Sequence, residues 1–344
     1  MKRLFFLFAA AILTLAGCAP KDSSRLPRGK AEAGQQEAFE AWLKAEADAG
    51  QTIHSAMLLQ HGKVIAERWM EPAAPDSAHI MHSVSKTFTS IAVGFAVSEG
   101  LLELDDHLVD FFPDKLPAEL SDNMRAITVR DLLTMSCGHE AEHTNEIRYD
   151  ESEPDWVKHF LSFPVERRPG TFFCYNTIGT YMLSAIVTKV TGEKIVDYLQ
   201  PRLWEPLAIE KPYWKECPKG INYGGWGLYL KTEDMAKTGQ MLLQKGQWKG
   251  KQVLPAEWVA EMSKCQIDNR PEDFDPATDT RPDWHQGYCY QMWRCRHNAY
   301  RADGAYGQYI IVLPEKDAVI AVTAEVKDMQ VELSLIWDCL LPVL

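Results

Sequence analysis

The sequence predicts a mixed α/β (α+β) protein with an antiparallel sheet built from both chain ends, flanked by helices, and a mainly helical region inserted between the ends. Strand-like runs flank a turn at residues 61–63 and recur at residues 307–323, while helical spacing dominates between them. Alternating or continuous apolar runs between turn signals indicate strands, whereas apolar residues three or four positions apart indicate helices. Segments far apart in the sequence must therefore complete one sheet.

The N-terminal part of the folded domain is predicted to be a helix that leads into a hairpin. Residues 37–49 have a helical pattern that stops before Gly50. Two strand-like runs follow, one on each side of the turn His61-Gly62-Lys63. This helix and hairpin supply the first half of the expected sheet.

The rest of the chain supplies the inserted helices and the second half of the sheet. Pro- and Gly-marked loops separate four helical patterns, at residues 86–99, 129–135, 180–190 and 232–244. We place the helical insertion roughly at residues 87–285. Residues 307–314 and 318–323 are predicted strands, and residues 329–341 a helix. No repeat of fixed period is visible.

The first residues have the pattern of an export signal. A positive start precedes a short apolar run, and Leu15-Ala16-Gly17-Cys18 resembles the bacterial lipobox, in which cleavage leaves Cys18 as the lipidated N-terminus. Ordinary signal cleavage nearby is the alternative. We expect residues 1–17 to be removed, residues 18–36 to form a polar tether and residues 37–344 to form the domain. The lipid would be the only membrane contact of a bacterial cell-envelope protein that faces the periplasm or the cell surface.

Charge and cysteine content narrow the partners. The formal net charge of −12 repels a phosphate backbone, and Lys and Arg form no stripe, so nucleic acid is not an expected partner. The expected partner is a small molecule or a peptide. Eight cysteines become seven if Cys18 carries lipid, and an oxidising compartment would permit bridges that leave at least one thiol free. No C-x-x-C spacing occurs, so the cysteines are given no catalytic or metal role.

The S-x-x-K sequence Ser83-Val84-Ser85-Lys86 is the main candidate for chemistry. Ser83 precedes an apolar helix, whose N-terminal N–H groups stabilise a developing oxyanion. Lys86 returns to the same helical face, and a lysine held against apolar groups loses its charge more readily and activates a serine. The alternative is that Ser83 only caps a core helix while Lys86 extends its stem to water.

Three further segments make the pattern more specific. Together with Ser83 to Lys86, the stretches 127–138, 169–175 and 304–308 resemble, in order, the β-lactamase-related serine hydrolases. This family comprises class C β-lactamase-like and penicillin-binding-protein-like members, including esterases and 6-aminohexanoate-dimer hydrolases. The resemblance covers roughly residues 50–325. It implies a β-lactamase/transpeptidase-like fold and acyl transfer through a seryl intermediate, with no cofactor and no metal.

The same resemblance assigns roles to two motifs. Tyr175 takes the place of the second-motif tyrosine, which acts as general base with Lys86, although an ordinary core aromatic is the alternative. The family pattern is Tyr-x-Asn, whereas this chain has Tyr175-Asn176-Thr177. In the third motif the N–H of Gln308 would pair with that of Ser83 as the oxyanion hole. The expected substrate contacts are Asn176, Thr177, Gly304, Tyr306 and Gly307.

The third motif also bears on the substrate. Residues 305–308 replace the usual Lys-Thr-Gly, so the cation that meets a substrate carboxylate is missing. We therefore expect an esterase or amidase acting on substrates without that carboxylate. Two alternatives stay open, namely D-amino-acid peptidase, penicillin-binding or weak β-lactamase activity, and a non-catalytic binding lipoprotein of the cell envelope.

Two other motifs are judged to be coincidental. Residues 139–143 spell the H-E-x-x-H of zinc peptidases, but they follow a helix-ending Cys137-Gly138 and lack an amphipathic helix, so a solvated charged loop is expected. Residues 121–123 spell S-D-N in a turn-rich stretch close after Ser83, where a turn or helix cap is expected.

Overall fold

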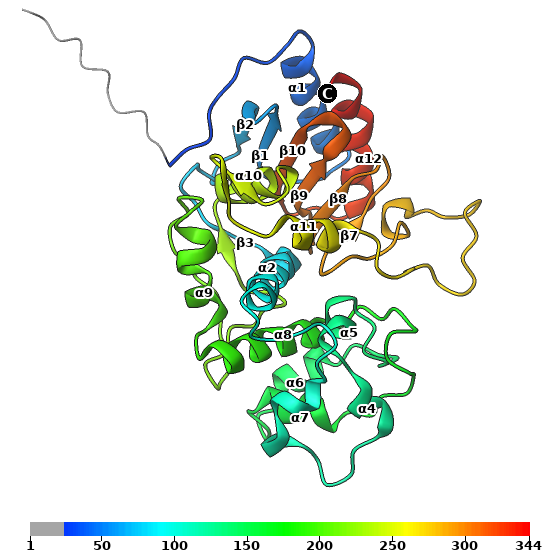
Figure 1. Cartoon of the computed structure of the whole chain (residues 1–344). Coiled ribbons are helices and arrows are strands. Elements are labelled where there is room, and N and C mark those ends of the chain that lie inside the picture. The colour runs from blue at the N-terminus through cyan, green and yellow to red at the C-terminus, as the bar shows by residue number, and fades with distance from the viewer. Residues whose placement is uncertain (1–23) are drawn as a thin grey trace, which may run out of the picture.

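A six-stranded antiparallel sheet forms one layer of the protein (Figure 1). The computed structural model describes residues 24–344. The strand order is β2-β1-β10-β9-β8-β7. In chain order the strands are β1 (Ile53–Gln60), β2 (Lys63–Trp69), β7 (Trp293–Arg294), β8 (Tyr300–Gly304), β9 (Gln308–Leu313) and β10 (Ala318–Ala324). Strand β1 pairs with β10 from Ile53 opposite Ala324 to Gln60 opposite Ala318, which confirms a sheet built from both ends of the chain.

Helices cover both faces of this sheet. Successive side chains of a strand point to opposite faces, and every residue of β9 and β10 is buried, so both faces must be covered. Helices α1 (Gln35–Asp48) and α12 (Met329–Cys339) pack on one face over a core that includes Trp42 and Ile320. Helix α10 (Thr232–Leu243) packs on β9 and β10 on the other face. The sheet therefore separates two hydrophobic cores, of which the one on the α10 side is the larger and continues into the helical region.

The helical region lies between β3 (His79–Ile80) and β7, with β4 (Tyr229–Leu230) pairing with β3. A short hairpin of β5 (Gln247–Trp248) and β6 (Lys251–Gln252) follows α10. The helices are α2 (Ser85–Ser98), α3 (Leu108–Phe111), α4 (Asp122–Ala126), α5 (Val129–Leu133), α6 (Thr144–Tyr149), α7 (Trp156–Ser162), α8 (Thr177–Thr191), α9 (Ile195–Tyr198) and α11 (Ala256–Ser263). Most of them gather at one end of the molecule, away from the sheet (Figure 1).

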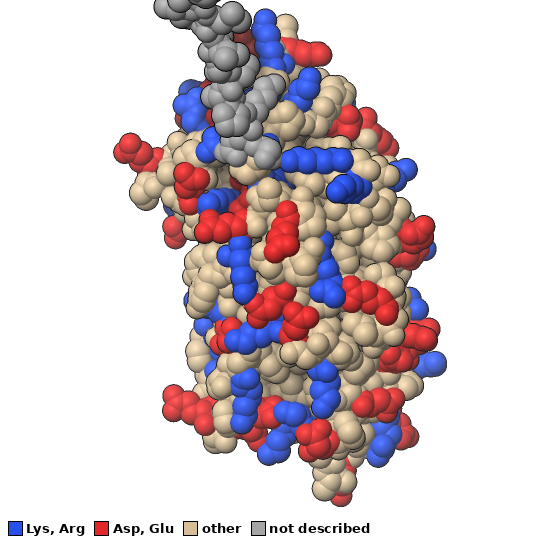
Figure 2. Space-filling model, turned by 60° about the vertical axis from the view of Figure 1, so that its left-hand side comes forward, with Lys and Arg blue, Asp and Glu red and all other residues tan. Residues whose placement is uncertain are grey.

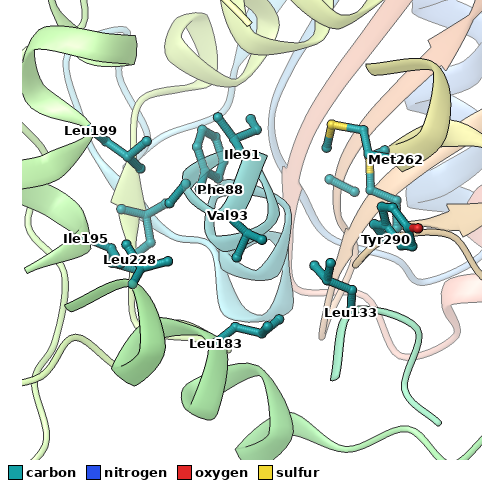
Figure 3. Close-up of a cluster of buried hydrophobic side chains, with 14 of the residues drawn as sticks. Phe88, Ile91, Val93, Leu133, Leu183, Ile195, Leu199, Leu228, Met262 and Tyr290 are labelled. Atoms are coloured by element: carbon teal, nitrogen blue, oxygen red, sulfur yellow. The ribbon is translucent and has the colours of Figure 1, made fainter. Parts of the chain in front are cut away.

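Helix α2 is the centre of the larger core. Every residue from Ser85 to Ala96 is buried, because the helix is covered by neighbours on all sides. Figure 3 shows Phe88, Ile91 and Val93 of α2 among apolar side chains from other elements, including Leu183 of α8. A helix packed in this way fixes the position of the turn that precedes it.

Residues before α1 are packed on the domain. Leu26 is buried, and Arg28 forms ion pairs with Glu67 of β2 and Glu233 of α10. The part of the expected tether from residue 24 onward therefore belongs to the folded structure, because an apolar side chain and a paired guanidinium hold it there. Residues 1–17 and Cys18, which carry the predicted signal and lipidation site, lie outside the described residues.

On the face shown in Figure 2, acidic and basic side chains are interspersed. Among residues 24–344, none of the helices is both long and apolar enough to cross a bilayer.

Candidate active site

Ser83 lies in a short 3-10 turn, His82–Val84, that joins β3 to the N-terminus of α2. The N–H of Met81 bonds the carbonyl of Leu228 at 2.8 Å, which ties the start of the turn to the segment before β4. His82 has a φ of 44°, a left-handed conformation that is uncommon and costly for a residue with a side chain. The surrounding structure thus holds the turn in a strained conformation that places Ser83 at the start of α2.

Lys86 is 1% exposed and points back to Ser83 from the first turn of α2. Its Nζ donates to Ser83 Oγ at 3.0 Å, to Thr177 Oγ1 at 3.2 Å and to the carbonyl of Gly225 at 2.8 Å. Burial lowers the pKa of Lys86 to about 7, although the charges of Glu142 and Asp303 oppose this shift. A large fraction of Lys86 is therefore neutral at physiological pH and able to accept a proton.

Tyr175 lies against both residues, in the segment just before α8. Lys86 Nζ is 4.9 Å from the centre of its ring, and the ring stacks on Trp293 with centroids 5.6 Å apart. Burial raises the pKa of Tyr175 above its usual range, while a hydrogen bond with Ser83 acts in the opposite direction. The structure thus brings Ser83, Lys86 and Tyr175 together, with the phenol in its protonated form at neutral pH.

The two residues after Tyr175 begin helix α8. Asn176 is buried, and its Oδ1 accepts the N–H of Gly179 at 2.9 Å, which is an N-cap bond. Thr177 accepts from Lys86 through its hydroxyl and donates its N–H to Glu142 Oε1 at 3.0 Å. Thr177 therefore lies in the site, whereas Asn176 caps the helix beside it; contact of either residue with substrate stays a prediction.

The predicted third motif is a tight turn between β8 and β9. The N–H of Gly307 bonds the carbonyl of Gly304 at 3.2 Å, and a Cβ on Gly304 would lie 2.4 Å from the carbonyl oxygen of Met81. Only glycine permits this close approach of β8 to the nucleophile turn. Tyr306 is 54% exposed, and its ring lies edge-on to His82 with centroids 5.3 Å apart. The turn therefore forms one wall of the site.

Gln308 fixes this turn to the sheet. Its side chain is fully buried, donates to the carbonyl of Ala324 at 2.6 Å and accepts the N–H of Ala324 at 3.0 Å. The same amide also donates to the carbonyl of Ala305 at 3.1 Å. These bonds explain why a glutamine stands at the start of β9, and the role of its N–H as an oxyanion donor stays a prediction.

Sequence reasoning missed a buried ion pair on β8. Arg301 and Asp303 point to the same side of the strand, with Nε and Oδ2 2.7 Å apart, and Arg301 is 0% exposed. Burial raises the pKa of Asp303, although the guanidinium of Arg301 opposes this, and the Asp303 charge acts on Lys86 and Tyr175. The signal in the sequence was the spacing of Arg301 and Asp303, because two opposite charges two positions apart in a strand lie on the same face and can pair.

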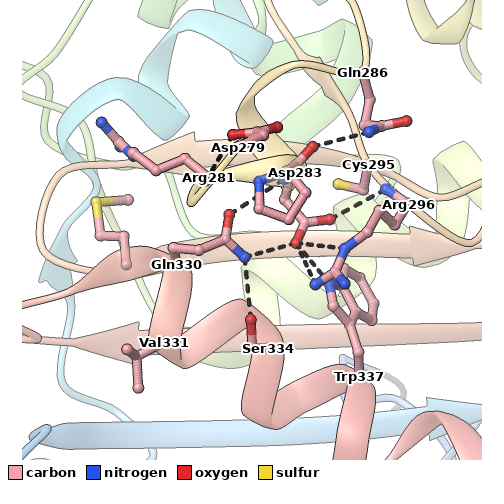
Figure 4. A network of polar contacts seen from close by, with 12 residues as sticks. Asp279, Arg281, Asp283, Gln286, Cys295, Arg296, Gln330, Val331, Ser334 and Trp337 are labelled. Carbon is pink, nitrogen blue, oxygen red and sulfur yellow. Dashed lines mark hydrogen bonds and ion pairs between the residues drawn. The ribbon is translucent and has the colours of Figure 1, made fainter. Parts of the chain in front are cut away.

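A buried polar network is centred on Asp283 (Figure 4). Asp283 accepts from Arg296, Gln330 and Trp337, and its carbonyl accepts from Arg301 at 2.9 Å. Burial alone would raise the pKa of Asp283, but these side-chain hydrogen bonds outweigh it and the pKa lies below its usual value. Its partners lie up to 54 positions away, so no sequence pattern indicated the network.

Among residues 24–344, no three His, Cys, Asp or Glu side chains are grouped closely enough to hold a metal ion. The H-E-x-x-H motif itself is not helical, as expected, whereas the helix α6 that begins after it at Thr144 was not predicted. Glu140 and Glu142 are exposed, but the expectation of a fully solvated loop is wrong for His139, which is buried against Phe160 because the rings pack 5.1 Å apart. Glu142 instead contacts the site through Thr177.

The S-D-N sequence and the cysteines lie outside this cluster of site residues. Ser121 caps α4 by accepting the N–H of Met124 at 3.1 Å, so the S-D-N sequence is a helix cap as predicted. All seven cysteines within residues 24–344 are free thiols.

The sheet, the buried helix α2 and the Ser83, Lys86 and Tyr175 cluster beside the Gly304–Gln308 turn place the protein in the β-lactamase fold class. Comparison with family models agrees, since the model described as Beta-lactamase matches residues 41–333. The chain belongs to the beta-lactamase family.

Individual relatives show which activities occur within this family. The 6-aminohexanoate-dimer hydrolase of Paenarthrobacter ureafaciens is 24% identical over 283 residues, which cover 77% of this chain and 70% of the relative. The lovastatin esterase of Penicillium rubens is 27% identical over 164 residues, 40% of each chain. The octameric penicillin-binding protein homologue from Pyrococcus abyssi superposes with a TM-score of 0.68 at 19% identity, covering 87% of this chain and 76% of that one. These similarities establish a shared fold in a family of hydrolases.

Proposed function

We propose that the protein is a serine hydrolase that cleaves esters or amides through an acyl-enzyme on Ser83. The observation that carries this proposal is the fully buried Lys86, whose Nζ lies 3.0 Å from Ser83 Oγ. A base at hydrogen-bond distance is what a serine hydroxyl needs to become a nucleophile. A pKa of about 7 allows Lys86 to accept that proton at neutral pH.

The proposed reaction uses these groups in turn. Neutral Lys86 takes the proton of Ser83 as Oγ attacks the carbonyl carbon, and the N–H groups of Ser83 and Gln308 stabilise the oxyanion. As the intermediate collapses, the C–O or C–N bond breaks, and the proton held by Lys86 reaches the leaving group by way of the Tyr175 hydroxyl. Water then attacks the acyl-enzyme with the same groups, releases the acid and restores Ser83.

The third motif points to the class of substrate. Residues 304–308 contain no cation, so nothing in this turn matches a substrate carboxylate, and Tyr306 presents an exposed aromatic ring instead. We therefore favour esters or amides whose acyl part lacks a carboxylate beside the scissile bond. A 6-aminohexanoate-dimer hydrolase and a lovastatin esterase are among the relatives, which is consistent with an ester or amide substrate.

We also propose that Cys18 is lipidated and that the domain is tethered in the bacterial cell envelope, facing the periplasm or the cell surface. The support is the sequence of residues 1–18 alone. Expression in a bacterium with an alkyne fatty acid should label the parent and leave a Cys18→Ser variant unlabelled. Equal absence of label in both would refute the lipid anchor.

Hydrolysis of a panel of p-nitrophenyl esters and anilides tests the catalytic assignment. Ser83→Ala should abolish turnover, while Ser90→Ala, which removes a buried hydroxyl from the same helix, should leave it unchanged. Turnover that persists in folded Ser83→Ala would refute the assignment. A β-lactam and a D-alanyl peptide are added to the panel. If the protein is a D-amino-acid peptidase or a β-lactamase instead, these two substrates should be preferred over the esters and anilides.

A further inference from the structure

A buried carboxyl group lies directly beneath the third-motif turn. Glu332 of α12 is 0% exposed, and neither of its carboxyl oxygens finds a hydrogen-bond partner within residues 24–344. A second buried carboxyl, Glu46 of α1, faces the same core and accepts from Trp42 Nε1 at 2.7 Å. Glutamates are almost never fully buried unless paired, so the position of Glu332 calls for a reason.

The reason lies in its contact with Gly307. This glycine has a φ of +89°, and a Cβ built on it would lie 2.2 Å from Glu332 Oε2 and 2.9 Å from the carboxyl carbon. The carboxyl group therefore fills the space that a side chain at position 307 would need. At the other end of the turn, a Cβ built on Gly304 would lie 2.4 Å from the carbonyl oxygen of Met81, next to the nucleophile turn. The turn is thus held between the Ser83 segment and Glu332.

Burial and two nearby carboxyl groups favour the neutral form of Glu332. Glu46 faces it from α1, Asp303 and Arg301 from β8, and Tyr309 from β9. Burial raises the pKa of Glu332 well above its usual range, the like charges of Glu46 and Asp303 raise it further, and Arg301 opposes them. These effects favour the neutral carboxylic acid, which packs against backbone without the cost of a buried charge.

We propose that Glu332, as a neutral carboxylic acid, is a positioning residue that holds the Gly304–Gln308 turn against Ser83, and that its ionisation at alkaline pH releases the turn. This inference rests on the proposed function, in which the turn supplies an oxyanion N–H. An ionised Glu332 needs hydrogen-bond donors or water. Glu332 can reach such donors or water only if the packing beneath Gly307 opens. That movement would shift the Gln308 N–H away from the oxyanion.

Ester turnover by three variants across pH tests the inference. Glu332→Gln keeps a neutral group of the same shape, so it should keep the parent's kcat at pH 7 and extend activity to higher pH. Glu332→Ala leaves the turn unsupported and should lower kcat by about tenfold or more with KM little changed, because the oxyanion develops after binding. Glu46→Gln removes a like charge, so Glu332 should ionise more easily and the alkaline fall should move to lower pH.

The outcomes separate this inference from the function on which it rests. If kcat falls at the same alkaline pH in the parent and in Glu332→Gln, the inference is overturned, even if Glu332→Ala fails to fold. Parental kcat in folded Glu332→Ala would overturn it too. Labelling of the parent at Ser83 by a fluorophosphonate reports the function separately, because its absence would refute the serine mechanism whatever the pH profiles show.

Discussion

Replacing Lys86 with Met should change both the chemistry and the pH dependence of folding. The substitution removes the ammonium group from a site where burial lowers the pKa from 10.5 to about 7. A depressed lysine pKa means that the folded state binds the proton less tightly than the unfolded state does. The parent therefore bears a cost at and below pH 7, and this cost disappears as the pH rises toward 10.5.

The size of the effect follows from the two pKa values. Each tenfold change in proton affinity corresponds to about 1.4 kcal/mol, so the full cost at low pH is about 5 kcal/mol, and roughly 2 kcal/mol of it is recovered between pH 7 and pH 9. The stability of the Met variant has no such dependence on pH, because methionine does not ionise. Lost hydrogen bonds to Ser83, Thr177 and Gly225 lower its stability by an amount that does not depend on the protonation of Lys86.

Urea unfolding of both proteins at pH 7 and pH 9 measures this difference. The parent should gain about 2 kcal/mol relative to Lys86→Met over that interval, by the linkage above. Acylation of the parent by a fluorophosphonate should also accelerate as the pH rises through about 7, and Lys86→Met should react far more slowly at every pH. A stability difference that stays constant with pH, or acylation of the parent that is independent of pH, would refute the neutral-lysine reasoning.

Three further substitutions test the surrounding structure. Asn176→Ala removes the N-cap of α8 and should lower stability by about 1 kcal/mol in urea unfolding, whereas Asn176→Ser should retain most of it; equal losses would argue against the cap. Asp303→Asn leaves the buried Arg301 guanidinium without its charge partner and should cost about 3 kcal/mol in the same assay, and an unchanged midpoint would contradict the pairing. Gly304→Ala places a Cβ 2.4 Å from the Met81 carbonyl oxygen, so it should slow acylation by a fluorophosphonate, and a parental rate would show that the turn does not need this approach.

The elements that could be predicted from sequence are those whose signal is local. The apolar run after Lys86 indicated α2, and the structure places it at Ser85–Ser98. Strands at both chain ends and the hairpin at residues 61–63 were also found as expected. The helix predicted at residues 180–190 begins three residues earlier, at Thr177. Its first turn is fixed by the hydrogen bond from the Gly179 N–H to Asn176, which apolar spacing does not reveal.

The features that escaped prediction depend on contacts between distant segments. The Asp303 charge reaches Lys86 only because β8 lies beside the nucleophile turn, and Glu142 reaches Thr177 across a loop that looked solvated. Glu332 of α12 lies against Gly307 of the turn between β8 and β9, a contact that no spacing within α12 reveals. The motif serine, lysine and tyrosine could be named from sequence, whereas the charges and packing that set their environment needed the fold.

The central claim is that Ser83 is an activated nucleophile, and mass spectrometry of the intact protein after treatment with a fluorophosphonate tests it most directly. The account predicts one adduct, mapped to the peptide that contains Ser83, which is absent from Ser83→Ala, present in Ser90→Ala and slow to form in Tyr175→Phe. No adduct on the folded parent, or an adduct that persists in Ser83→Ala, would contradict the account.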